Sequence, residues 1–281
     1  HTRPVCSRPV AILAILLGYG VLQSVLLPPD GSFAGDCAAK YLQARAVLAN
    51  GPLRPWIEGP AIDAETALRW REPVLLARGG HLVSQFSWVM PLFGAPFLGL
   101  FGLRGLYVVP AVSIAVIFLA ASSIGRSLGQ RAGGAWSGWC AVLATPLLFY
   151  GAELWEHAPA VALTAIATAI LVRDERLTPR GAFAIALCLV GAFSLRAETF
   201  AAGPALLLAR ALTFGRSTIV RDLRTLLPGG LVAFGVLAVM NYASYGHVIP
   251  AHVQEQVGGG LSSWELRRDA IDWLLLPPSN R

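Results

Sequence analysis

Residues 105–125 read GLYVVPAVSIAVIFLAASSIG and contain no charged side chain before Arg126. A helix needs roughly 20 predominantly apolar residues to cross a bilayer, so this segment predicts a transmembrane helix. Similar apolar segments recur along the chain. We expect about seven spans, at 9–28, 105–125, 134–152, 158–172, 181–199, 201–214 and 226–245.

The composition favours the same fold class. Of the 281 residues, 55% are hydrophobic and 14% are charged, whereas soluble domains carry about 25% charged residues. We therefore expect an all-α, polytopic transmembrane helix bundle. The net charge of +6 does not indicate nucleic acid as a partner, because the basic residues sit in short loops between apolar segments, as topology signals do.

Arginines predict the orientation of the bundle, because short cytoplasmic loops are enriched in basic residues. The loops concerned precede the first span or follow the second, fourth and sixth; their arginines are Arg3, Arg8, Arg126, Arg131, Arg173, Arg176, Arg180, Arg210, Arg216, Arg221 and Arg224. These arginines lie on one side of the membrane only if the apolar stretch 86–103 does not cross the bilayer. We therefore predict that 86–103 is a juxtamembrane or re-entrant helix on the outer side, with a cytoplasmic N-terminus.

The largest outer segment in this topology is a first loop at about 29–104, within a membrane module that covers 1–255. Residues 256–281 are then a tail. Within the loop, Asp36 can cap a juxtamembrane helix that runs past Tyr41 and stops at Asn50-Gly51. Asp36 can also act as a carboxylate at the membrane surface that accepts a proton from a hydroxyl or an amine.

A second group of ionisable residues, Glu153, Glu156 and His157, lies where the third span should leave the membrane. Ordinary loop solvation explains such a group, but Pro159 follows at once and the turn is short. Ionisable residues at that depth usually face the interior of the bundle or a cavity. We therefore take these three residues as site candidates.

Arg196 and Glu198 interrupt another apolar region. They form either a local ion pair at a helix end or an anion site, since a guanidinium is well suited to phosphate. Asn241, Tyr245 and His247 are candidates for hydrogen bonding to a substrate, and Lys40 is the only lysine in the chain. His247 and His252 are not spaced i, i+4, so we expect no metal site and no cofactor, with a divalent ion as the unsupported alternative.

Several short segments, in this order and on one predicted side, resemble the GT-C glycosyltransferases, a class that includes protein O-mannosyltransferases and the aminoarabinose transferases of lipid A. The segments are Gly35-Asp36, Tyr41-Leu42-Gln43-Ala44-Arg45, Ser84-Gln85-Phe86, Pro91-Leu92 through Phe101-Gly102, Trp155-Glu156-His157-Ala158-Pro159, Arg196-Ala197-Glu198-Thr199, and Asn241 to Tyr245-Gly246. The resemblance covers about residues 9–255.

The resemblance implies a seven-helix module with a large first outer loop, in which Asp36 matches the first-loop acid that acts as base or orients the acceptor. Many members have a second acid next to it, but here Cys37 follows. Glu153 or Glu156 would then substitute for it. Family members usually continue into further spans, so we expect a fragment or a reduced member.

From the residues and the resemblance we expect a membrane glycosyltransferase in the bacterial inner membrane with a periplasmic active face. It would transfer a sugar from a polyprenyl-phosphate carrier to a lipid, glycan or protein acceptor. The expected catalytic residues are Asp36, Glu153 and Glu156; the expected substrate-binding residues are Lys40, His157, Arg196, Glu198, Asn241, Tyr245 and His247. A non-catalytic assembly subunit and a lipid or solute transporter are the alternatives.

Overall fold

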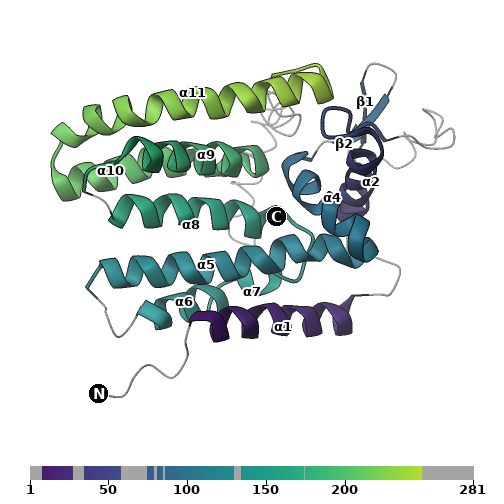
Figure 1. Cartoon of the computed structure of the whole chain (residues 1–281), viewed down its shortest axis with the longest axis horizontal. Helices are drawn as coiled ribbons and strands as arrows, with labels where there is room; N and C mark the ends of the chain where they lie inside the picture. The colour runs from purple at the N-terminus through teal and green to yellow at the C-terminus, as the bar shows by residue number, and fades with distance from the viewer. Residues whose placement is uncertain are drawn as a thin grey trace, which may run out of the picture.

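The computed structural model describes residues 8–27, 35–57, 75–78, 81–84, 86–129, 134–173 and 175–248. The predicted tail at 256–281 lies outside them. The described chain is mostly helical. Its longest helices lie side by side in a row (Figure 1): α1 (Arg8–Leu26) packs on α5 (Val108–Ser127), α5 on α8 (His157–Arg173), α8 on α9 (Pro179–Leu195), and α9 on α11 (Ser217–Tyr245).

Three described helical stretches are long and apolar enough to cross a membrane: Arg8–Leu26, Val89–Ser127 and Ser217–Ser244. Two shorter apolar helices are His157–Arg173 and Pro179–Leu195. Large apolar side chains are exposed along α1 and α11, for example Leu17, Val21, Leu231 and Val239. Such surface is costly in water and stable in lipid, which indicates an integral membrane protein.

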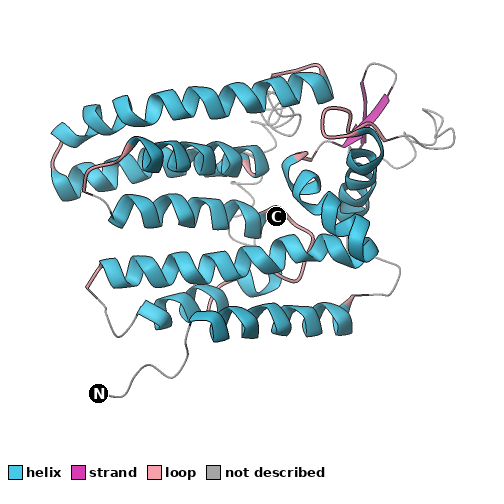
Figure 2. Cartoon of the chain, viewed as in Figure 1, coloured by secondary structure: helices cyan, strands magenta, loops and turns pink. Residues whose placement is uncertain are grey.

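The elements of the predicted first loop gather at one end of the row (Figure 1). They are α2 (Gly35–Asn50), which packs on α4 (Val89–Phe101), and an antiparallel hairpin of β1 (Leu75–Arg78) and β2 (His81–Ser84), drawn as magenta arrows in Figure 2. Helix α2 ends at Asn50 before Gly51, as predicted; Gly51 has φ 84°. The hairpin departs from the all-α expectation, although a Gly-Gly pair such as Gly79-Gly80 is a hairpin signal in a sequence.

Helix α4 covers most of the stretch that we predicted to be a juxtamembrane or re-entrant segment. It ends at Gly102, whose φ of 65° requires glycine, and a 3-10 segment, η1 (Gly102–Tyr107), leads into α5. A Cβ on Gly105 would collide with the backbone of Phe97, so η1 turns back onto α4. As a result α4 lies with α2 and the hairpin at the end of the row (Figure 1).

The predicted span at 134–152 is wrong as a single helix. The structure divides it into α6 (Gly134–Leu143) and a short α7 (Leu147–Tyr150). Pro146 explains the division, because proline has no N–H and disfavours helical geometry in the residue before it. The Thr145 hydroxyl bonds the Ala141 carbonyl at 2.7 Å and the Leu147 N–H at 3.2 Å. With 10 residues, α6 is about 15 Å long, half of the bilayer core.

Helix α1 supplies hydrogen bonds to the carbonyls around this break. The Tyr19 hydroxyl donates to the Leu148 carbonyl at 2.9 Å. The Gln23 amide donates to the Tyr107 and Gly151 carbonyls, each at 3.2 Å. The polar side chains of α1 therefore fix α7 and the start of α5 in place.

The remaining predicted spans differ from the helices in their bounds. Helix α9 stops at Leu195, and residues of the predicted span 181–199 continue into a 3-10 turn, η2 (Ala197–Ala201). Helix α10 (Ala202–Phe214) has 13 residues, about 20 Å, which is shorter than the bilayer core. Helix α11 begins at Ser217, well before the predicted 226.

A buried ion pair joins three helices at the end of the row opposite to α2. Arg210 of α10 donates from Nε to Asp222 Oδ2 of α11 at 2.7 Å. Its Nη1 donates to the Leu171 carbonyl at 2.6 Å and its Nη2 to the Glu175 carbonyl at 2.8 Å. Arg210 therefore caps the C-terminal end of α8, where the helix dipole favours a cation.

Candidate functional site

Lys40 forms a buried ion pair with Glu156. Its Nζ lies 2.9 Å from Glu156 Oε2, and the two side chains are 2% and 6% exposed. Lys40 belongs to the buried face of α2, together with Cys37, Ala44 and Val47, which follows the 3.6-residue period of a helix. Its ammonium also lies 4.6 Å from the centre of the Phe86 ring, a cation–π contact.

Glu153 lies in the loop between α7 and α8 and interacts electrostatically with the same lysine. Burial raises the pKa of its carboxyl above the usual value, and the positive charge of Lys40 opposes part of that rise. Glu153 Oε2 is buried without a hydrogen-bond partner among the described residues. The loop therefore places two carboxylates beside one lysine.

His157 is the first residue of α8 and belongs to an aromatic group with Tyr150 and Trp155. Its ring stacks on Tyr150 with centroids 4.3 Å apart, and it lies 5.4 Å from Trp155. His157 Nδ1 and Trp155 Nε1 are buried without a partner in the described chain. The two aromatic rings thus orient a histidine whose Nδ1 has no hydrogen-bond partner among the described residues.

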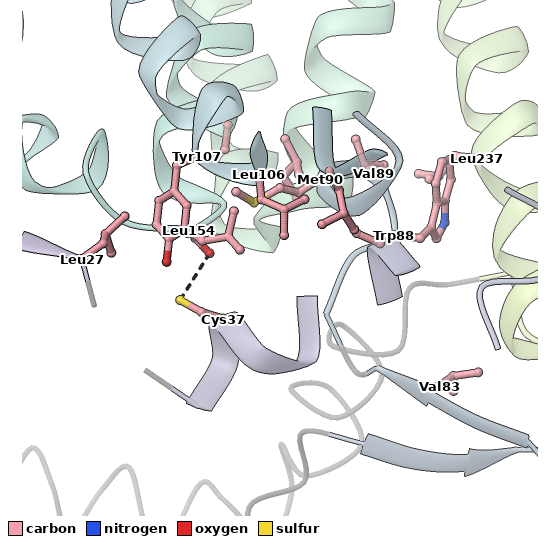
Figure 3. Packing of buried hydrophobic residues seen from close by; sticks show 14 residues of the cluster. Leu27, Cys37, Val83, Trp88, Val89, Met90, Leu106, Tyr107, Leu154 and Leu237 are labelled. Carbon is pink, nitrogen blue, oxygen red and sulfur yellow. Dashed lines mark hydrogen bonds between the residues drawn. The ribbon is translucent and has the colours of Figure 1, made fainter. Parts of the chain in front are cut away.

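Tyr107 and Cys37 extend the group toward α2. Figure 3 shows them beside Leu154, with the Cys37 thiol directed at the Leu154 carbonyl at a distance of 4.0 Å. The Tyr107 hydroxyl is close enough to Cys37 and Glu153 to interact with their charges. That hydroxyl has no hydrogen-bond partner among the described residues, although Tyr107 is 1% exposed. Sequence reasoning missed Tyr107, because it lies inside the most apolar stretch.

Several buried polar atoms of these residues have no hydrogen-bond partner among the described residues. Glu153 Oε2, Glu156 Oε1, His157 Nδ1, Trp155 Nε1 and Tyr107 Oη all lack partners within the described residues. Buried polar groups are nearly always hydrogen-bonded, and each exception calls for an explanation such as a catalytic or binding role. We call Lys40, Tyr107, Glu153, Trp155, Glu156 and His157 the α2-end cluster.

Arg196 and Glu198 form the local ion pair that was one of the two interpretations of their sequence. Arg196 Nη2 lies 2.7 Å from Glu198 Oε1, with side chains 35% and 60% exposed. Partial burial raises the pKa of Glu198, but its own backbone N–H and Arg196 outweigh that effect, so the net pKa is lowered. Both charges act on His157, which places them near the α2-end cluster.

Asn241 uses its amide within the protein. It accepts from Trp88 Nε1 at 2.7 Å and donates to the Val248 carbonyl at 3.0 Å, and it is 1% exposed. Trp88 packs with Leu237 in the same apolar cluster (Figure 3). Asn241 therefore joins the start of α4 to the end of α11.

The remaining candidates are resolved only in part. Asp36 lies in the first turn of α2, one residue after its start and one helical turn before Lys40. The structure describes its backbone and not its side chain. The same holds for the side chain of Tyr245, the last residue of α11. His247 is exposed in the segment after α11.

The acidic and histidine side chains of the α2-end cluster do not form a metal-binding set. Among the described residues, no three His, Cys, Asp or Glu side chains converge closely enough to hold a metal ion. The carboxylates instead face one ammonium group, an arrangement suited to holding or exchanging a proton.

Comparisons with known proteins add no assignment. No family model, no curated protein and no solved structure matches this chain.

Proposed function

We propose that this protein is a membrane glycosyltransferase of the GT-C type, which transfers a sugar from a polyprenyl-phosphate carrier to an acceptor at the α2 end of the bundle. The observation that supports this proposal is the α2-end cluster: two glutamates share one buried lysine, and each keeps a buried carboxylate oxygen without a hydrogen-bond partner among the described residues. Such unsatisfied acceptors suit a hydroxylated substrate.

The proposal includes a topology of about seven spans in a bacterial inner membrane. The helix ends that carry Arg8, Arg126, Arg173, Arg216 and Arg221 lie at one end of the row, and α2 lies at the other (Figure 1). If the arginine-rich end is cytoplasmic, the α2-end cluster faces the periplasm. Cysteine labelling from outside the cell tests this orientation: a cysteine at position 247 should react, and one at position 176 should not.

The chemistry requires a base and a positively charged environment. The acceptor hydroxyl attacks the anomeric carbon, a carboxylate takes its proton, and the bond from that carbon to the phosphate oxygen breaks. We assign the base to Asp36, with Glu153 and Glu156 as the acids that substitute for the missing neighbour of Asp36. Arg196, Lys40 and His157 are the groups that would stabilise charge on the departing phosphate.

A transfer assay with a labelled polyprenyl-phosphate sugar tests the proposal. Asp36→Asn, Glu153→Gln and Glu156→Gln should each reduce transfer by about 10²-fold or more, the effect of losing a general acid or base. Glu175→Gln is the matched control, because Glu175 is exposed at the other end of α8, and should retain full transfer. Full transfer by Asp36→Asn, Glu153→Gln and Glu156→Gln alike would overturn the assignment.

A second function, a non-catalytic assembly subunit, is favoured by a different observation. Several expected substrate-binding residues use their polar atoms on the protein itself: Arg196 on Glu198, Asn241 on Trp88, and Lys40 on Glu156. A purified chain that transfers no sugar but is isolated with partner subunits would support this second function.

A further inference from the structure

We infer that the two glutamates of the α2-end cluster have different roles: Glu156 is the ion-pair partner of Lys40, and Glu153 is the group that takes up and releases a proton. This inference rests on the proposed function and concerns the same site. Its test needs no transfer activity, so the two can fail separately.

The contacts of Lys40 distinguish the two glutamates. Glu156 Oε2 is 2.9 Å from Lys40 Nζ, which is the distance of a charge-assisted hydrogen bond. Glu153 Oε2 is buried without a hydrogen-bond partner among the described residues, although the carboxyl lies close enough to interact electrostatically with Lys40. One ammonium group therefore neutralises Glu156 directly and Glu153 only at longer range.

The balance of charges around Lys40 also distinguishes Glu153 from Glu156. Lys40 is nearly fully buried, and so is Glu156; a buried charge is costly unless it is paired. Arg196, whose charge acts on His157 of the same cluster, is paired with Glu198 at 2.7 Å. With both glutamates ionised, the buried group carries one negative charge too many, and a proton on Glu153 removes it. The raised pKa of Glu153 agrees with this balance.

Two titratable groups of other elements interact electrostatically with Glu153: Lys40 of α2 and Tyr107 of η1. Tyrosine is neutral in its usual form, so Lys40 is the one described cation that acts on Glu153. Two carboxyls with different environments in one site are the usual arrangement by which a protein separates a proton donor from a fixed anion.

Infrared difference spectroscopy during a pH titration tests this inference on the full chain in nanodiscs. We expect one carboxyl to lose its proton at a higher pH than an ordinary glutamate, and Glu153→Gln should abolish that signal. Lys40→Met should move its midpoint to higher pH, because a stabilising positive charge is lost. Glu156→Gln should move it to lower pH, because Lys40 is then free to pair with Glu153.

Two further variants serve as controls. Glu175→Gln and Asp36→Asn should both retain the high-pH carboxyl signal. A signal that survives in Glu153→Gln, or that disappears in Asp36→Asn, would overturn the assignment. If Glu153→Gln does not fold, Glu153→Asp replaces it: a moved midpoint supports the inference, and an unchanged midpoint contradicts it.

The pH dependence of the melting temperature gives a second, independent measure of the protonation of Glu153. A carboxyl whose pKa is higher in the folded than in the unfolded state stabilises the fold below its unfolded pKa, and that contribution is lost as pH rises through the folded pKa. Glu153→Gln should therefore flatten the decline in Tm across that pH interval. An equally steep decline in the variant would show that Glu153 does not carry the proton.

Discussion

The two ends of α8 each hold a buried ion pair, and the pairs differ in how completely they are satisfied. At the C-terminal end, Arg210 bonds Asp222 and the Leu171 and Glu175 carbonyls, and Asp222 Oδ1 also accepts from Arg221 at 3.3 Å. At the N-terminal end, Lys40 reaches one oxygen of Glu156, and the polar atoms around it lack partners in the described chain. A saturated pair serves the fold, whereas an unsaturated pair leaves atoms available for a substrate.

The largest effect should come from breaking the saturated pair. Asp222→Asn leaves Arg210 buried at 4% exposure with a charge that it cannot lose. Removing one partner of such a pair costs about 3–5 kcal/mol, so we expect a large loss in the free energy of unfolding. Thermal or denaturant unfolding in detergent measures it. A loss below about 1 kcal/mol, the range of a surface pair, would show that the Arg210–Asp222 pair does not stabilise the fold as proposed.

A smaller effect should follow from the same change at the other end. Glu156→Gln also removes a buried negative charge, but Lys40 keeps the Phe86 contact and has Glu153 within electrostatic range. We expect a loss of about 1–3 kcal/mol, as for a buried hydrogen-bonding group that loses its partner. The same unfolding assay measures both variants, and a greater loss in Glu156→Gln than in Asp222→Asn would reverse the comparison.

The smallest effect should come from the exposed pair. Arg196→Met breaks the contact to Glu198, but both side chains are solvent-accessible and water screens their attraction. Exposed pairs contribute about 0.2–1 kcal/mol, so the free energy of unfolding should change by less than about 1 kcal/mol. Glu198→Gln is the matched variant and should give the same small change. A loss as large as that of Asp222→Asn would mean that Arg196 has a structural role that its contacts do not show.

Sequence patterns predicted local features better than long-range ones. The stop of α2 at Asn50-Gly51 and the Arg196–Glu198 pair depend on residues close together in the chain, and both were among the sequence interpretations. The break at Pro146 was missed because hydropathy averaged over a window does not register one missing N–H. The Lys40–Glu156 and Arg210–Asp222 pairs were missed because the two partners of each pair come from different elements, and a single sequence does not show which elements lie against each other.

The candidate site was predicted in part for the same reason. Glu153, Glu156 and His157 were recognised as a group because they are neighbours in sequence. The structure joins the expected Lys40 of α2 to this group and adds Tyr107 of η1, which was not expected. Asn241 was expected to bind substrate, but its amide is occupied by Trp88 and Val248. Composition could not reveal this, because an asparagine that braces two helices and one that binds a ligand look identical in sequence.

The division of 134–152 into α6 and α7 has a consequence for how the chain is made. In hydrocarbon, carbonyls released by a broken helix cannot find water, and each unmet group costs several kcal/mol. Tyr19 and Gln23 of α1 supply donors for the Leu148 and Gly151 carbonyls of this segment. Because α1 precedes this segment in the chain, its donors are synthesised before the carbonyls that need them. We therefore expect the break between α6 and α7 to depend on α1 for its hydrogen bonds.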